Sequence, residues 1–153
     1  MWTERIDALL REMPDDSEQM LELGATLGME VDREEWAAVC SAEGIELDSH
    51  LIEGLLRRRL AEASGTGRLR HAHGMLGEAL LARAKEANRL KRHHEVCAQM
   101  LESKSGQLGI AERRARHFIA AGLHEAALDP LLKAATERRA SSDLRQAIRL
   151  LDI

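Results

Sequence analysis

His93 and Cys97 carry the side chains of this sequence that are best placed to bind a metal ion. They lie four positions apart in a segment predicted to be helical, so they share one helix face, with His94 next to them. A zinc site needs several converging ligands, whereas Cys40 and His50 lie in a different part of the chain. We therefore interpret Cys97 and Cys40 as small, buried free thiols, and we predict no metal and no other cofactor in this chain.

The sequence lacks the common catalytic motifs. It has no Gly-x-x-x-x-Gly-Lys-Ser/Thr loop, no His-Glu-x-x-His, no Gly-x-Ser-x-Gly and no Cys-x-x-Cys. The glycine pairs within residues 74–77 and 106–109 lack the lysine and the hydroxyl side chain that a phosphate-binding loop uses. We therefore predict that the chain is not an enzyme.

His73 is predicted to begin a helix directly after a strand. A histidine in this position can hydrogen-bond the neighbouring backbone, and no acid or nucleophile is spaced for catalysis with it. We expect His73 to hold the strand against the helix, with His71 close by. Glu78, on the next turn, belongs to the same predicted structural junction.

The segments that position these residues are separated by strong helix stops. Apolar residues at helical spacing predict a first helix over residues 2–13, and Pro14 ends it. Asp15 or Asp16 is expected to cap a second helix, which stops at Gly28.

Two further helices follow, each with an aspartate at its start. Asp32, with Glu35 three residues later, predicts a capping box for a third helix that stops at Gly44. Asp48 is expected to cap a fourth helix. That helix ends in a cluster of basic residues, Arg57, Arg58 and Arg59.

Residues 60–71 are the one segment in which we predict strands. Two short runs flank the turn Ser64-Gly65-Thr66-Gly67, and Gly-rich turns of this length favour hairpins. From His73 onward the chain is rich in Ala and helix formers. Helices are predicted at residues 73–86, 88–103, 110–121, 123–140 and 142–152.

Composition and length agree with a mainly α fold. The 153 residues fit one mid-sized domain or two very small ones that share a core. The chain is 44% hydrophobic but only 2% aromatic, which suits closely packed helices better than sheets. No apolar run is long enough to cross a membrane and no signal-peptide pattern opens the chain, so we expect a cytoplasmic protein without membrane partners.

Charge is strongly polarised along the chain. Residues 1–56 carry 3 basic and 15 acidic side chains, whereas residues 57–153 carry 19 basic and 11 acidic ones. Either the two halves present opposite faces to different partners, or they attract each other within the protein. We favour the second interpretation, because neighbouring segments of one short chain tend to pack together.

The junction at residues 68–80 resembles a region of bacterial signal-transducing ATPases of the STAND class and their AAA-like relatives. In that family a strand with a basic residue runs into a helix that opens with His and continues to Glu-Ala-Leu, as His73 and Glu78-Ala79-Leu80 do here. The sequence departs from the pattern at His71, where the family has an aromatic residue, and at Gly77, where it has Arg. Pro14, Leu27-Gly28 and Leu55-Leu56 also follow the order of the family's winged-helix segment.

A second resemblance covers the segment from Ala115 to Ala134. Its residues are similar to a tetratricopeptide repeat, with small residues that let two helices approach and one bulky side chain, Leu131, that fills the remaining gap. One full repeat and the start of another are visible, so we expect an incomplete array from a longer protein. The sequence thus predicts a winged-helix-like domain at residues 1–72 and a repeat region at residues 73–153.

These resemblances imply a non-catalytic regulatory module that binds proteins. In the intact protein the winged helix would pack on an upstream ATPase core, and the repeats would bind a protein or peptide partner in a groove. A kinase-linked regulator would use such a module in the same way. By family spacing, the groove would be lined by Glu112, Arg113, Arg116 and Ala120.

DNA binding is the alternative function. Winged helices often place a helix in the major groove, and five arginines gather around the fourth helix and the hairpin. Two features weigh against DNA binding. The segment 1–56 has a large excess of acidic residues that would repel DNA, and side chains that read bases are scarce around residues 51–60. The candidate nucleic-acid residues are Arg57, Arg58, Arg59, Arg68 and Arg70.

Overall fold

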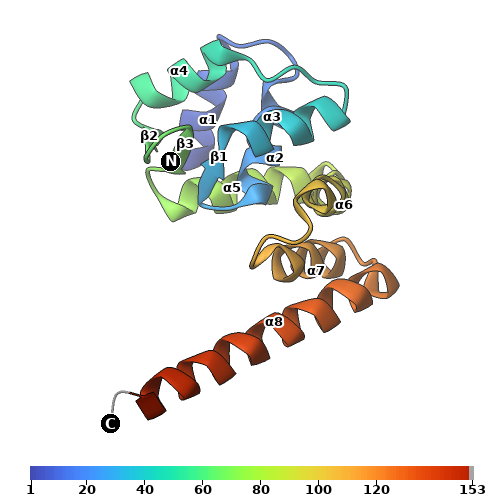
Figure 1. Cartoon of the computed structure of the whole chain (residues 1–153). Helices are drawn as coiled ribbons and strands as arrows, with labels where there is room; N and C mark the ends of the chain where they lie inside the picture. The colour runs from blue at the N-terminus through green and yellow to red at the C-terminus, as the bar shows by residue number, and fades with distance from the viewer. Residues whose placement is uncertain (152–153) are drawn as a thin grey trace.

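The part of the chain that the structure describes folds into eight α-helices and a small three-stranded antiparallel sheet (Figure 1). The computed structural model describes the backbone of residues 1–151 and the side chains of residues 1–142 and 145. The mainly helical fold predicted from the sequence is confirmed. The elements in chain order are α1 (Trp2–Leu10), α2 (Ser17–Leu27), β1 (Glu30–Asp32), α3 (Arg33–Ala42), α4 (Ser49–Arg57), β2 (Ala61–Ala63), β3 (Arg68–His71), α5 (Gly74–Glu86), α6 (Leu90–Leu101), the 3-10 turn η1 (Glu102–Lys104), α7 (Ile110–Ala120) and α8 (His124–Leu151).

Side chains cap α3 and α4 as predicted. Asp32 Oδ1 accepts from the backbone N–H of Glu34 at 2.8 Å, and Asp48 Oδ1 accepts from that of His50 at 2.8 Å. The predicted cap of α2 is wrong, because Asp16 already has helical backbone angles and makes no side-chain cap hydrogen bond. The return half of the predicted capping box does not form either, since the carboxylate of Glu35 binds basic residues elsewhere.

The predicted hairpin forms, but it is part of a larger sheet. Strands β2 and β3 pair antiparallel with Ala61 opposite His71, which confirms the hairpin. Strand β1 then pairs with the other edge of β3, placing Val31 opposite Leu69, and gives the order β1-β3-β2. The prediction of a lone hairpin was therefore incomplete, because a three-residue strand is stabilised by a distant partner and has no local signal of its own.

The C-terminal helix differs from the prediction. Residues 123–140 and 142–152 were expected to form two helices, yet α8 continues without a break from His124 to Leu151. Ser141 and Ser142 lie where the break was predicted, and serine interrupts a helix far less than glycine or proline does. Pro130, which lies inside α8, does not end the helix.

Most of the hydrophobic core lies between α1–α4, the sheet and the next two helices. The core includes Leu76 and Leu80 of α5 and Val96 and Cys97 of α6, so it continues across the predicted boundary at residue 72. The division into two domains stays a prediction. A smaller separate cluster joins α6, α7 and α8 through Ala98, Phe118 and Ala127.

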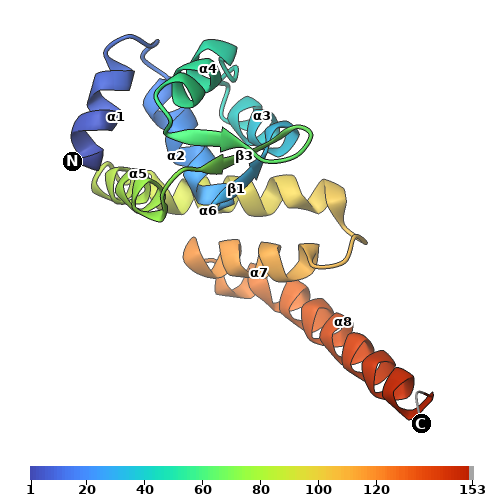
Figure 2. The same ribbon diagram turned by 90° about the vertical axis from the view of Figure 1, so that its left-hand side faces the viewer.

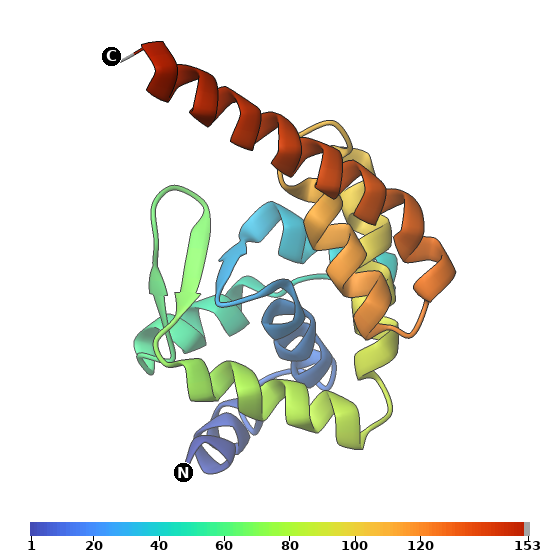
Figure 3. The ribbon, with the colours of Figure 1, turned by 90° about the horizontal axis from the view of Figure 1, so that it is seen from below.

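The helices from α6 onward form an arm on one side of this core. Figure 2 shows α6 between the α1–α4 unit and α7, with α8 packed on the far side of α7. In the view of Figure 3, α8 runs past the rest of the protein and its C-terminal half projects beyond α7. No helix of the described residues is both long and apolar enough to cross a membrane.

Candidate protein-interaction site

A buried ionic cluster ties α6 to α2 and so fixes the base of the arm. Glu22 of α2 is fully buried and accepts two hydrogen bonds from Arg89, at 2.9 and 2.6 Å. Its carboxylate also lies 2.8 Å from Nε2 of His93, which is 2% exposed. Burial by itself raises the pKa of Glu22, but the bonds to Arg89 and His93 outweigh it and lower that pKa.

A second carboxylate connects the arm to α3. Glu35 binds Arg113 of α7 through two hydrogen bonds at 3.0 and 2.8 Å, and Lys104 at 2.9 Å. Burial opposes ionisation of this carboxyl, but the two cations dominate and lower the pKa of Glu35 to about 2. The carboxylate therefore stays charged at neutral pH and holds α7 in a fixed position against the core.

Further ion pairs join the acidic first half of the chain to the basic second half. Arg83 of α5 binds Asp7 and Glu18, and Arg92 of α6 binds Glu43. These contacts support the interpretation that the two halves attract each other within the protein. Part of the opposite charge of the two halves is therefore used in attraction within the protein.

Two histidines meet where α6 contacts α7. His94 Nδ1 lies 2.9 Å from His117 Nδ1, and the two rings are 5.2 Å apart between centroids. Burial lowers the pKa of both, that of His117 to about 4, and nearby positive charge lowers each further, from His93 at His94 and from His94 at His117. This contact therefore requires at least one neutral imidazole, since one ring must donate and the other accept.

The residues predicted to line a groove of the repeat do not all share one surface. Glu112 accepts from Arg116 and from Arg138 of α8, whereas the guanidinium of Arg113 is turned to the core and held by Glu35. Neighbouring positions of a helix point about 100° apart, so Glu112 and Arg113 face different partners. Ala120 is exposed at the end of α7.

A shallow groove follows the contact between α7 and α8. It has a volume of about 300 Å³, with Ala115 and Arg116 on one side and Leu131, Ala135 and Arg138 on the other. The prediction that Leu131 fills the gap between the paired helices is wrong, because it is 42% exposed. Ala127 and Ala134 occupy the inner face of α8, which leaves Leu131 at the groove edge.

The arm also exposes several large apolar side chains. Leu128 is 58% exposed and Leu132 69% exposed, next to the half-exposed Leu131. Isolated apolar residues are common on protein surfaces, whereas these three are neighbours on one helix. Leu108, Ile119 and Leu123 of this region are also exposed.

His73 occupies the junction predicted for it. Its Nδ1 accepts from the backbone N–H of Met75 at 3.3 Å and so caps α5. Its ring also packs against Trp2 of α1, with centroids 5.2 Å apart. The histidine thus connects the end of β3 to two helices, whereas Glu78 is exposed on the next turn of α5.

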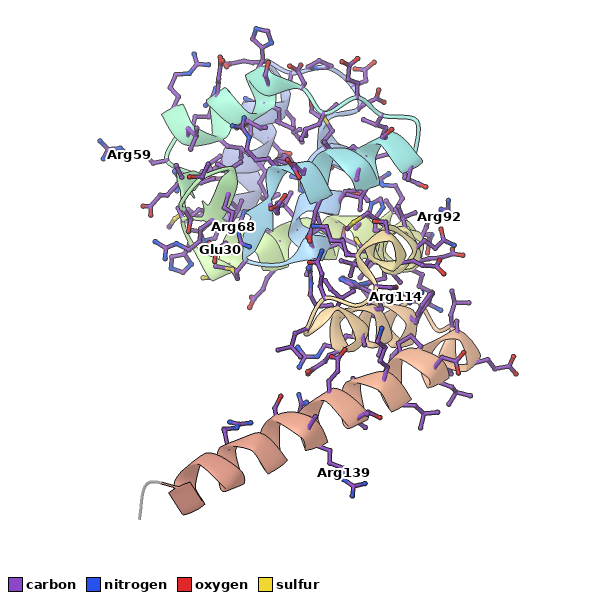
Figure 4. All side chains as sticks on the ribbon, in the orientation of Figure 1. Glu30, Arg59, Arg68, Arg92, Arg114 and Arg139 are labelled. Atoms are coloured by element: carbon purple, nitrogen blue, oxygen red, sulfur yellow. The ribbon has the colours of Figure 1, made fainter. Side chains whose placement is uncertain are left out.

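The five arginines of the DNA alternative do not form one free basic surface. Arg58 pairs with Glu12, and Arg70 pairs with Glu62. Arg57, Arg59 and Arg68 are exposed, and Figure 4 shows Arg59 pointing away from the rest of the protein.

The cysteines lie in the core, and the suggested metal ligands are engaged elsewhere. Cys40 and Cys97 are buried free thiols, and burial raises the pKa of each to about 12. His93 binds Glu22, and His50 lies beside Asp48 at the protein surface. Within the residues that the structure describes, no three His, Cys, Asp or Glu side chains converge as a metal ion requires.

Sequence reasoning did not identify Glu22 or Glu35 as buried anchors. The only available signal was that Glu22 stands between Leu21 and Leu23 in an apolar stretch, where an acid needs a partner. No family model, curated protein or solved structure matches the chain.

Proposed function

We propose that this chain is a non-catalytic regulatory module that binds a protein or peptide partner through its α6–α8 arm. The observation that carries this proposal is the apolar row Leu128, Leu131 and Leu132 beside the α7–α8 groove. The arm is attached by Glu22 and Glu35, so this surface is held in place before a partner arrives. Rigid surfaces bind with a smaller entropic cost than flexible ones.

The fold supports a winged-helix-like assignment for residues 1–72. Helices α2, α3 and α4 precede the β2–β3 hairpin, and the hairpin lies beside them with β1 at its edge. The hairpin is the wing in this interpretation. The junction at His73, with its cap and its contact to Trp2, would keep the wing in a constant orientation relative to α5.

The arrangement of the second half supports a repeat-like assignment for residues 73–153. Successive helices α5 to α8 each pack on the next one, and the small residues Ala115 and Ala127 lie buried where α7 and α8 meet. Gly122 has a φ of 79° in the turn between these two helices, where glycine is favoured.

In this proposal the module belongs to a cytoplasmic signalling protein, either a STAND-type ATPase or a kinase-linked regulator. The buried free thiols Cys40 and Cys97 suit a reducing compartment. The ATPase itself would be encoded upstream. Reading the natural gene on the 5′ side of the Met1 codon tests this part: a phosphate-binding loop within a few hundred codons supports it, and an unrelated upstream gene contradicts it.

The binding role is tested with displayed random peptides selected on the full chain. Peptides that use the groove should lose at least about tenfold in affinity for Leu131→Asp, because a charge replaces a buried contact. Leu56→Asp is the matched control, since Leu56 is 38% exposed on the distant helix α4. Peptides that bind both variants as well as the parent chain would show that the groove is not the site.

Binding of duplex DNA is the second candidate function, and the exposed Arg57, Arg59 and Arg68 favour it. Fluorescence anisotropy with a labelled duplex at low and moderate salt measures it directly. Binding that weakens steeply with salt, and that is lost when all three are changed to Glu, supports this function. The same substitutions should leave peptide binding to the arm unchanged.

A further inference from the structure

We propose that a pocket between the end of α2, the end of β3 and the first turns of α5 binds a small, uncharged molecule with a hydroxyl group on an aromatic ring. The pocket encloses about 340 Å³, a size typical of small-ligand sites. It lies outside the α7–α8 groove, so the inference goes beyond the proposed function and does not depend on it. Its lining includes Gly28, Met29, His71, Gly74, Gly77 and Leu81.

Missing side chains on one face of α5 create the space. Gly74 and Gly77 are one helical turn apart, and Leu81 continues the same face as a wall. A Cβ at Gly77 would lie 4.0 Å from Cδ2 of His71, and one at Gly74 would lie 3.9 Å from Sδ of Met29. Either position could therefore hold a Cβ atom in ordinary van der Waals contact, and the two glycines leave that volume to a ligand.

His71 forms part of the inner wall, with both of its ring nitrogens buried. The residue is 9% exposed, and neither ring nitrogen has a hydrogen-bond partner among the described residues. Burial lowers the pKa of His71, so the ring is neutral at pH 7 and carries one donor and one acceptor. Cδ2, which is bonded to Nε2, is the atom of the His71 ring nearest to a Cβ at Gly77. Rotating the ring by 180° about the Cβ–Cγ bond would put Nδ1 in the place of Cδ2.

These features together select the ligand class. A buried polar group without a partner is costly, so a ligand that bonds His71 removes that cost, and a hydroxyl can both donate and accept. The thioether of Met29, which is 46% exposed, favours contact with an aromatic ring. The carboxylate of Glu78 lines the pocket as well and disfavours anions.

A larger pocket on the other side of α5 lacks this character. It measures about 600 Å³ and is bordered by Arg83 and Arg89. Arg83 already donates to Asp7 and Glu18, and Arg89 to Glu22, so both guanidinium groups are used in holding the fold.

The test titrates the full chain with 4-methylphenol and follows backbone amides by two-dimensional NMR. The chain has no Tyr and one Phe, so ligand aromatic signals are easily observed as well. We expect saturable shifts at Gly28, Gly74 and Gly77, with toluene about tenfold weaker because it lacks the hydroxyl. 4-Methylbenzoate should also bind more weakly. Shifts that do not saturate, or that centre elsewhere, would overturn the proposal.

Two variants separate a specific site from adventitious binding. Gly77→Leu should abolish the shifts by filling the pocket, whereas Ala82→Leu adds the same side chain on an exposed position of α5 and should leave them unchanged. His71→Phe should weaken 4-methylphenol about tenfold and leave toluene unaffected. If His71→Phe weakens the binding of both ligands equally, or of neither, His71 does not bind the hydroxyl group. Circular dichroism checks that each variant is folded, and the ring ¹⁵N shifts of His71 in the parent chain give the same answer without a substitution.

The same phenolic group could come from a free metabolite or from a Tyr side chain of a partner. N-Acetyltyrosine amide distinguishes the two sources. Binding tighter than that of 4-methylphenol assigns the site to a partner's tyrosine, and weaker binding assigns it to a free small molecule.

Discussion

Replacing Arg89 with Met tests how the arm is attached to the core. The change keeps much of the apolar length of the side chain but removes both hydrogen bonds to Glu22, at 2.9 and 2.6 Å. Glu22 is fully buried, so the carboxylate cannot turn to water. It would keep a single partner, His93.

The expected cost follows from the burial of the carboxylate. Removing one partner of a buried ion pair typically lowers the free energy of unfolding by about 3 kcal/mol, and here the buried charge loses its arginine partner. Arg92→Met, in the first turn of α6, is the matched control. Arg92 is 51% exposed and pairs with Glu43 and Glu95, so its loss should cost less than about 1 kcal/mol.

Equilibrium unfolding in urea, followed by circular dichroism, measures both variants. With a slope of about 2 kcal/mol per molar urea, Arg89→Met should lower the midpoint by about 1.5 M and Arg92→Met by less than about 0.5 M. A third variant replaces the whole cluster with apolar residues, as Glu22→Leu, Arg89→Met and His93→Leu together. It should regain most of the loss, because an apolar core does not need the charge pair.

Equal midpoints for the two single variants would refute the reasoning, since they would show that Glu22 gains nothing particular from Arg89. A combined variant less stable than Arg89→Met would also contradict it. In that case the cluster would stabilise the protein beyond satisfying one buried charge.

Three more outcomes are expected from other contacts. Gly77→Ala should raise stability by about 0.5–1 kcal/mol, because it favours the helix and its Cβ meets nothing closer than 4.0 Å. Gly24→Ala should lower stability by about 1–3 kcal/mol, since its Cβ would lie 2.9 Å from the Trp36 ring. Thermal melts measure both variants, and shifts of the two in the same direction would contradict one of the two predictions. Because burial lowers the pKa of His117 from 6.5 to about 4, the unfolded chain binds more protons between those values, and stability should fall as the pH is lowered from about 6.5 to about 4. His117→Phe should flatten that part of the pH profile, and an unchanged profile would show that the His94–His117 contact is not responsible.

Local chemistry made much of the helical layout predictable. Asp32 and Asp48 cap their helices because the signal lies within three residues of the helix start. The turn at Gly65 and Gly67 has positive φ angles that glycine adopts easily, and the hairpin forms around it. The predicted break near Ser141 failed because no residue there prevents a helix from continuing.

The candidate site depended on information that a single sequence does not display. Helical spacing placed Glu112 and Arg116 on one face of α7, but the position of α3 decided that Arg113 would bind Glu35. The exposure of Leu131 likewise followed from how α8 is rotated against α7.

The sequence alone determined where most helices begin and end, that a glycine-rich turn makes a hairpin, and that the two halves carry opposite charge. These features arise from neighbours in the chain, whose geometry is fixed by covalent distance. Tertiary structure decided that β1 joins the sheet, that Glu22 meets Arg89 and His93, and that His71 borders a pocket. The contacts of β1 with β3 and of Glu22 with Arg89 join residues about 40 to 70 positions apart in the sequence. They form because a buried strand edge or a buried charge needs a hydrogen-bond partner, and that partner comes from a distant part of the chain.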